Sequence, residues 1–444
     1  MGFQKNRRSK IKSVDRRMIF VIDSGGIGGK MRKMVSAPLV FYFVCFVASA
    51  ASASVIDANF STEFYGYKVK IPEDQDQIRS LQGVRLGIHD AFVPGLSLYA
   101  RGRVASDLSN KFSTDPDWRV FGAYLQYSPS KAFSAKAGRQ YVSAGLGGIT
   151  LDGGRLDLFY QDLTLTGYVG TTPGPSFFNY DAINGWDKSN AYGGRLKYAG
   201  LKWWTFGLSF MERNYSGNLD SRIGGFDFSY SRGNCSEFGR IDYEIFQKKV
   251  KLVTIRPSLR LKQGHSIGLE YLYRRPTFGI SSIFSVFKNE PFHQIRVNPI
   301  LKINENVYGL GSLAYTRYDD DDNIRISAGA SYRSQSGGVV FSDGYGGARL
   351  GIFASVNRKL SEDLSAYLFG DMFNYKLDTN EEDTTPSLAA SLGANCQLLR
   401  EINVRGEVQL LSNRDYKYDT RFYVKADYTL RMSQADVTGG GGYR

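Results

Sequence analysis

The stretch INVRGEVQL (residues 402–410) alternates apolar and polar side chains, and FYVKADYTL (residues 422–430) does the same. A period of two is typical of a β-strand whose two faces meet different surroundings. VRLGIH (residues 84–89), near the other end of the chain, repeats the pattern. These segments predict a sheet that is apolar on one face and charged on the other.

The same unit recurs along the whole chain from about residue 57. Roughly ten to fourteen alternating residues are followed by a turn or loop, which predicts about 22 antiparallel strands, or about 18 if neighbouring segments are merged. After Ser54 no apolar stretch is long enough for a spanning helix, and no amphipathic helix of three turns is evident. The chain is therefore either a soluble all-β sandwich or a transmembrane β-barrel.

The lengths of the connections favour the barrel. Short turns are predicted at residues 93–95, 161–162, 264, 304–305 and 399–400. Longer polar loops interleave with them at residues 71–80, 106–117, 172–188, 276–291 and 378–385. Short turns on one rim and long loops on the other are typical of an outer-membrane up-and-down barrel. Aromatic residues recur near strand ends in the apolar phase and fit an interfacial girdle; examples are Tyr160, Phe210, Tyr243, Tyr271, Tyr273 and Tyr428.

The formal net charge of +13 does not indicate a nucleic-acid partner. Residues 1–53 hold ten Lys and Arg against two acidic residues, which leaves a net charge of +5 for the rest of the chain. The basicity belongs mainly to the leader, so a reading as a nucleic-acid-binding protein loses its main support.

The N-terminal segment is interpreted as a secretory leader. Met31-Arg32-Lys33 starts a basic region, residues 37–47 form an apolar stretch, and Ala51-Ser52-Ala53 gives a small-x-small cleavage site. We therefore expect a signal peptide at residues 31–53, preceded at residues 1–30 by a segment upstream of the true start or a disordered leader. The barrel is expected over residues 54–432, with a flexible glycine-rich tail at residues 433–444.

Two cysteines, Cys235 and Cys396, remain after the leader. They lie on predicted strands far apart around the barrel. We expect free thiols rather than a disulfide.

One hairpin resembles a known class of porin. Lys136-Ala137-Gly138-Arg139-Gln140 is followed by Asp152-Gly153-Gly154-Arg155-Leu156-Asp157. This is similar to the alginate-export type of porin, in which a GRQ strand end and a DG-x-R strand start flank a loop on the lumen side. The match covers less than a tenth of the chain and implies a porin-like barrel without fixing the substrate. The chain departs from the usual barrel pattern because its last strand ends near Met432 and not on a terminal aromatic residue.

Assigning the charged phase to the lumen gives a set of candidate selectivity residues. The basic members are Arg85, Arg101, Arg103, Arg155, Arg195, Lys197, Arg256, Arg260, Arg325, Arg333, Arg405 and Lys425. The acidic members are Asp157, Asp242, Glu244, Glu270, Glu407 and Asp427. An excess of Arg and Lys on a narrow wall favours anions. The alternative is that these charges pair across strands and only stiffen the wall.

No catalytic or metal site is expected. His89 lies beside Asp90 in sequence, but neighbours on a strand point to opposite faces and do not form a dyad. His265 and His293 lie at a turn and at a strand start. The acidic run Asp319–Asp322 lacks the spacing of an EF-hand and is interpreted as a solvated turn. No cofactor is implied.

The loop at residues 172–188 carries an aromatic cluster, Ser176-Phe177-Phe178-Asn179-Tyr180. It could fold into the lumen as a constriction, bind a ligand at the rim, or pack its rings against the wall. The sequence does not separate these three.

Taken together, the sequence predicts an outer-membrane channel for passive passage of small solutes, with an anionic preference, or of an acidic polysaccharide. The alternative is a structural or adhesive barrel with functional surface loops and a closed lumen, and an enzymatic barrel comes third. The expected partners are outer-membrane lipid, small solutes and, during biogenesis, the barrel-assembly machinery. No nucleic acid is expected, and the sequence leaves the oligomeric state open.

Overall fold

The computed structural model describes residues 55–69, 75–109, 116–173, 183–276, 290–376, 383–414 and 417–433. The predicted signal peptide, the segment before it and nearly all of the predicted tail lie outside these residues. So does the aromatic cluster at residues 176–180. Within the described residues no helix is both long and apolar enough to cross a membrane.

The described chain is almost entirely β-structure. Its first eleven strands are β1 (Val55–Val69), β2 (Gln75–His89), β3 (Leu96–Asp107), β4 (Asp117–Ser130), β5 (Phe133–Ser143), β6 (Gly148–Tyr160), β7 (Leu163–Thr171), β8 (Ser189–Leu201), β9 (Trp204–Tyr215), β10 (Asn218–Arg232) and β11 (Cys235–Glu244). After β12 (Lys249–Arg260) comes a short 3-10 turn, η2 (Lys262–Gly264). The remaining strands are β13 (Ser266–Arg274), β14 (Phe292–Lys302), β15 (Val307–Arg317), β16 (Asp322–Tyr332), β17 (Gln335–Gly344), β18 (Arg349–Lys359), β19 (Leu364–Tyr375), β20 (Thr385–Leu399), β21 (Ile402–Ser412) and β22 (Asp419–Ser433).

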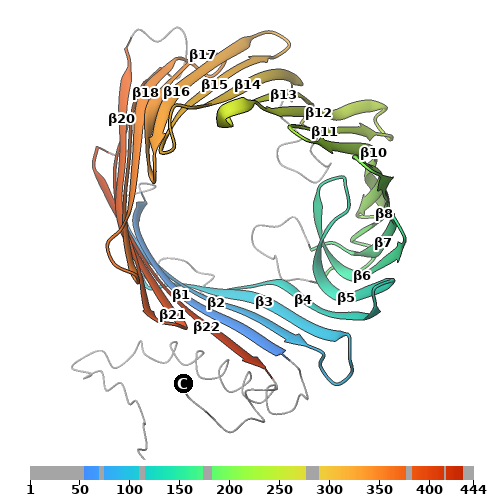
Figure 1. Ribbon diagram of the computed structural model, residues 1–444. Coiled ribbons are helices and arrows are strands. Elements are labelled where there is room, and N and C mark those ends of the chain that lie inside the picture. The colour runs from blue at the N-terminus through green and yellow to red at the C-terminus, as the bar shows by residue number, and fades with distance from the viewer. Residues whose placement is uncertain are drawn as a thin grey trace, which may run out of the picture. The chain divides into compact units, whose positions relative to one another are not determined.

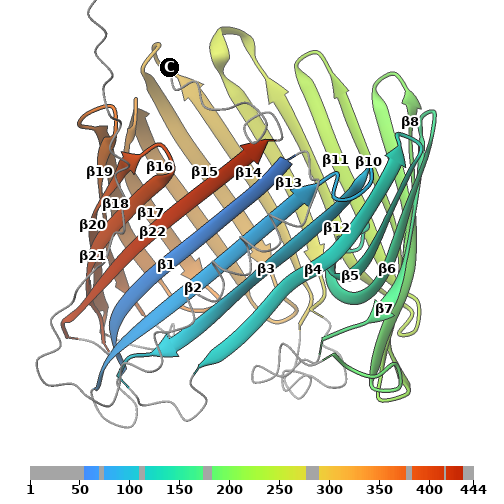
Figure 2. The same ribbon diagram turned by 90° about the horizontal axis from the view of Figure 1, so that it is seen from below.

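These 22 strands close into one antiparallel barrel. Each strand pairs with its neighbours in sequence, and β1 pairs with β22 from Val55↔Ser433 to Gly66↔Phe422. Figure 1 looks into the ring, and Figure 2 shows β22, β1 and β2 side by side and strongly tilted. Closure removes the two free edges of the sheet, so the predicted up-and-down barrel and the upper strand count are confirmed.

The two rims differ as the turn pattern predicts. The rim that holds Val55 and Ser433 has only short connections, among them the turns at Gln161 (φ 49°) and Gly264 (φ 85°). All five predicted long loops fall on the opposite rim, between β1 and β2, β3 and β4, β7 and β8, β13 and β14, and β19 and β20. That rim also has one tight turn at Ser216-Gly217, between β9 and β10. In single-chain bacterial barrels the short-turn rim faces the periplasm.

Both described cysteines are free thiols, as expected. Cys235 starts β11 and Cys396 lies in β20, so many strands separate them around the ring.

Candidate functional site: the polar face of the barrel

The two faces of the sheet have opposite chemistry. At alternate positions, large apolar side chains are exposed. Leu350 and Ile352 on β18, for example, are 59% and 57% exposed. The intervening positions hold buried charges, such as Asp157, Asp242 and Glu244. A soluble sandwich would bury its apolar face, whereas a membrane barrel turns it toward lipid. The fold therefore defines an outer-membrane β-barrel, and we call its two sides the apolar face and the polar face.

The strand register places seventeen of the eighteen predicted selectivity residues on the polar face. Directly paired residues share a face, and the links run from Arg85↔Arg101 through Lys136↔Arg155 and Thr166↔Arg195 to Arg405↔Lys425. The exception is Arg333. It lies in the turn after β16 with φ 54°, and its guanidinium sits over the Tyr332 ring, 5.2 Å from the centroid. The prediction that Arg333 lies on a strand was wrong. The alternation continues past Tyr332 into a turn, and this turn has no glycine or proline to mark the end of the strand.

Several arginines in the sector from β6 to β13 are paired with carboxylates, although no described carboxylate forms an ion pair with Arg260 on β12. Both Nε and Nη2 of Arg155 donate to Asp157, and Nη2 of Arg195 donates to Asp227 at 2.6 Å. Arg240 pairs with Asp242 on β11, and Arg256 and Arg296 share Glu270 at 2.8 and 3.5 Å. The charges of these pairs neutralise one another, and their side chains fill the wall.

A second paired group lies where β19 to β22 meet β1. Arg405 donates to Glu407 at 2.8 Å and to the Tyr367 hydroxyl at 2.9 Å. Lys425 bridges Glu63 at 3.4 Å and Asp427 at 3.3 Å. This group also combines ion pairs with aromatic rings.

The sector from β2 to β4 differs. Among the described residues, no carboxylate forms an ion pair with Arg85, Arg101 or Arg103. Arg101 and Arg103 each lie over the Phe121 ring, 5.6 Å from its centroid. The neighbouring Tyr99 and Tyr124 rings stack at 4.9 Å. Arg119 on β4 is paired with Asp117, at 3.0 Å. The sector thus carries uncompensated cations among aromatic faces.

The tip of the β5–β6 hairpin lies inside the ring (Figure 1). A methyl group added at Gly145 would come within 2.0 Å of the Ser209 hydroxyl, and one at Gly225 within 2.3 Å of the Leu146 side chain. Ser209 and Gly225 belong to the polar face of β9 and β10. The tip therefore packs on the inner wall, on the side of the ring opposite β18 and β20.

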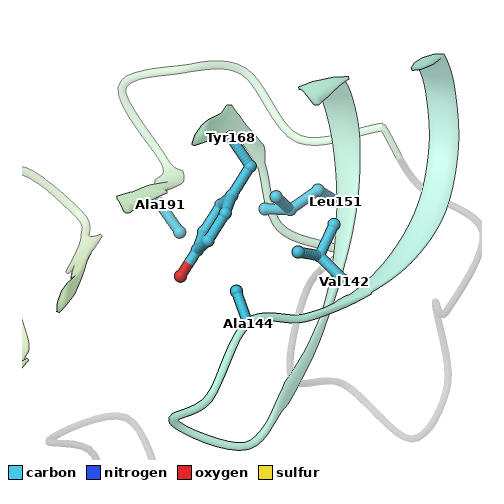
Figure 3. Close-up of a cluster of buried hydrophobic side chains, with 5 residues drawn as sticks. All are labelled: Val142, Ala144, Leu151, Tyr168 and Ala191. Carbon is cyan, nitrogen blue, oxygen red and sulfur yellow. The ribbon is translucent and has the colours of Figure 1, made fainter. Parts of the chain in front are cut away.

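An apolar cluster holds this hairpin in place. Val142, Ala144 and Leu151 of the hairpin face Tyr168 on β7 and Ala191 on β8, as Figure 3 shows. All five are buried, and Ile149 and Met211 pack against them. The sequence resemblance placed a loop on the lumen side here, but nothing in the alternation signalled an apolar core inside the ring.

His89 and His293 each contact an aromatic side chain, and Nδ1 of His265 accepts a hydrogen bond from the Lys302 amide at 3.0 Å. Nε2 of His89 lies 3.4 Å from the Asp57 carboxylate, and its Nδ1 lies 3.4 Å from the Tyr99 hydroxyl. His293 packs on Tyr273 at 4.8 Å between ring centroids. Within the described chain, no group of three His, Cys, Asp or Glu side chains has the arrangement of a metal site.

No family model matches the sequence, and no curated protein matches it. Solved structures similar to the chain include OccAB3 of Acinetobacter baumannii, with 8% identity and a TM-score of 0.43, covering 85% of this chain and 99% of the other. OprD of Pseudomonas aeruginosa has 12% identity and a TM-score of 0.38, covering 86% and 98%. The translocation pore of the P pilus usher PapC has 9% identity and a TM-score of 0.46, covering 85% and 100%. Similarity at this level says nothing about solutes or site residues.

Proposed function

We propose that the chain is an outer-membrane channel for passive passage of small solutes, with a preference for anions. The observation that carries this proposal is the set of arginines on β2 and β3, Arg85, Arg101 and Arg103, for which no carboxylate partner is found among the described residues. With the polar face lining the lumen, these cations stand where a permeating ion passes.

The net field in the lumen comes from the charges that have no partner. The ion pairs between β6 and β13 contribute little net field, because each guanidinium lies within hydrogen-bond distance of a carboxylate. A pore wall of low dielectric focuses the field of the uncompensated arginines into the lumen. Rings of Arg and Lys make such a pore selective for anions.

The hairpin tip gives the channel a narrower section. It occupies part of the ring between β5 and β10. Tyr141, on the same hairpin, is 65% exposed. A solute passing the arginine sector therefore also passes this hairpin. An acidic polysaccharide is a more specific candidate solute, because its carboxylates would also interact with these arginines. A structural or adhesive barrel with a closed lumen is the alternative.

The test is conductance and reversal potential of the refolded barrel in a planar bilayer under a potassium chloride gradient. We expect steady open steps and a reversal potential that indicates chloride preference. The double variant Arg101→Glu/Arg103→Glu should shift the preference at least several-fold toward potassium. The control Arg101→Lys/Arg103→Lys keeps both charges and should keep the preference. A silent barrel would support the structural alternative, and native potassium preference would refute the anion proposal.

A further inference from the structure

The barrel wall is interrupted between β4 and β5. The β4–β5 pairing ends at Ala123↔Arg139, although β4 continues to Asp117 and pairs there with β3. On the other side, the β6–β7 pairing ends at Asp152↔Thr171. From residue 140 to residue 151 the hairpin strands pair only with each other among the described residues, and they turn inward (Figure 1). On the side away from β3, residues 117–122 of β4 therefore pair with no described strand.

The height of this break is comparable to one leaflet. Six residues rise about 20 Å along a strand, at about 3.4 Å each. A strand tilted by about 40° covers about 15 Å of the membrane normal over that length. The hydrocarbon core of a whole bilayer is about 30 Å thick. Over this height no described strand pairs with β4 to separate the inside of the ring from the apolar face.

A buried ion pair marks the base of the break. Nε and Nη2 of Arg139 donate to the two carboxylate oxygens of Asp152, at 2.7 and 2.8 Å. Nη1 of Arg139 also donates to the Val120 carbonyl, at 3.2 Å. Both residues belong to the phase that elsewhere faces lipid, and Arg139 is 6% exposed. An isolated exposed edge in hydrocarbon is costly, and this arginine satisfies one of its carbonyls.

The rest of the break joins apolar and cationic surface. Trp118 and Val120 on the apolar face of β4 are 54% and 41% exposed. Phe121 occupies the bulge between β3 and β4, where the register shifts, and the guanidinium groups of Arg101 and Arg103 both lie over its ring. Lipid-facing apolar side chains of β4 and uncompensated cations of β3 thus meet around Phe121.

We propose that this break is a lateral route between the lumen and the membrane for amphipathic monoanions, which carry one carboxylate and an acyl chain. Arg101 and Arg103 hold the carboxylate, and the acyl chain passes Phe121, Val120 and Trp118 into the lipid. Since an acyl chain is poorly soluble in a wet lumen, leaving sideways lets it enter hydrocarbon directly. A small hydrophilic anion does not partition into hydrocarbon, so it crosses along the axis of the barrel. The inference shares two arginines with the proposed function but uses a different exit.

The test blocks the break without touching the arginines. In a background where Cys235 and Cys396 are Ser, Val120→Cys is labelled in the membrane with a bulky maleimide. The matched control is Val339→Cys on β17, which is also on the apolar face and is 49% exposed in the native chain. Uptake of radiolabelled dodecanoate is measured in cells in which this barrel is the only route for it, and chloride conductance is measured on the same labelled proteins in a bilayer.

We expect labelling at position 120 to lower dodecanoate uptake at least fivefold and to leave chloride conductance unchanged, while labelling at position 339 changes neither. Unchanged uptake after full labelling at position 120, or an equal fall at position 339, would overturn the lateral route. Absence of dodecanoate uptake by the unlabelled barrel would overturn it as well. Loss of chloride preference in the unlabelled barrel would count against the axial channel alone, so the two proposals fail separately.

Discussion

The sectors β2–β4 and β6–β13 both carry arginines on the polar face of the sheet, but the groups that surround these arginines differ. In the second sector guanidinium groups meet buried carboxylates, as in Arg155–Asp157 and Arg195–Asp227. In the first, Arg101 and Arg103 lie over the ring of Phe121 and have no ion pair in the described part of the chain. An arginine paired with a carboxylate contributes to the structure of the wall. An arginine without such a partner attracts anions that pass through the lumen.

The largest effect on stability is expected at Asp157. This carboxylate is 5% exposed and accepts hydrogen bonds from Arg155 and from the Thr166 hydroxyl at 2.7 Å. Asp157→Ala leaves a guanidinium without its partner, and breaking a buried pair costs about 4 kcal/mol. The measurement is the free energy of unfolding in guanidinium chloride, with the protein in lipid.

The control for this variant is Asp117→Ala in the other sector. Asp117 pairs with Arg119, but both side chains are about one-third exposed, at 34% and 32%. Exposed pairs contribute at most about 1 kcal/mol. Equal losses at the two positions would contradict the distinction between the sectors.

The next largest effect is expected in the hairpin core. Leu151 is fully buried against Val142 and Tyr168, so Leu151→Ala should cost about 3 kcal/mol. It should also loosen the hairpin tip and increase the current noise of single channels. The comparison is Leu156→Ala, on the same strand but 40% exposed on the apolar face. A quiet channel with native stability for Leu151→Ala would show that the cluster does not hold the tip.

The smallest effect on stability is expected at Arg85. Removing a cation that has no carboxylate partner among the described residues should change the free energy of unfolding by less than about 0.5 kcal/mol. Arg85→Gln should nevertheless lower the chloride-to-potassium permeability ratio by about twofold, because it removes one of the three uncompensated charges on β2 and β3. Reversal potentials and unfolding curves on the same preparation test both parts. A large loss of stability would mean that Arg85 belongs with the structural arginines.

The sequence predicts the strands well because alternation is a local property. The expected number of about 22 strands matches the 22 observed, and the pair Arg155–Asp157, two residues apart on one strand, could be anticipated. The pair Arg195–Asp227 could not, because it depends on the register of three strands. Arg333 was misplaced because alternation does not show where a strand ends.

The resemblance to a porin hairpin implied a loop on the lumen side here, but the alternation did not predict the inward bend. Gly138 has φ 122°, and a methyl group there would come within 2.3 Å of the Ala123 carbonyl, so only glycine permits β4 and β5 to separate at this point. The direction of the bend depends on Arg139 reaching the Val120 carbonyl. That contact joins residues on two different strands, and a pattern read along the chain does not contain it.

The seam between β1 and β22 has a consequence for how the molecule is made. The Asn59 amide donates to the Thr429 hydroxyl at 3.0 Å, across 370 positions of sequence. The edge of β1 that pairs with β22 therefore stays unpaired until the last strand has been synthesised. Contacts of such long range form slowly, and an unfinished sheet exposes two adhesive edges meanwhile. A chain that stops before β22 leaves both edges open, so translation to Ser433 is a condition for any stable barrel at all.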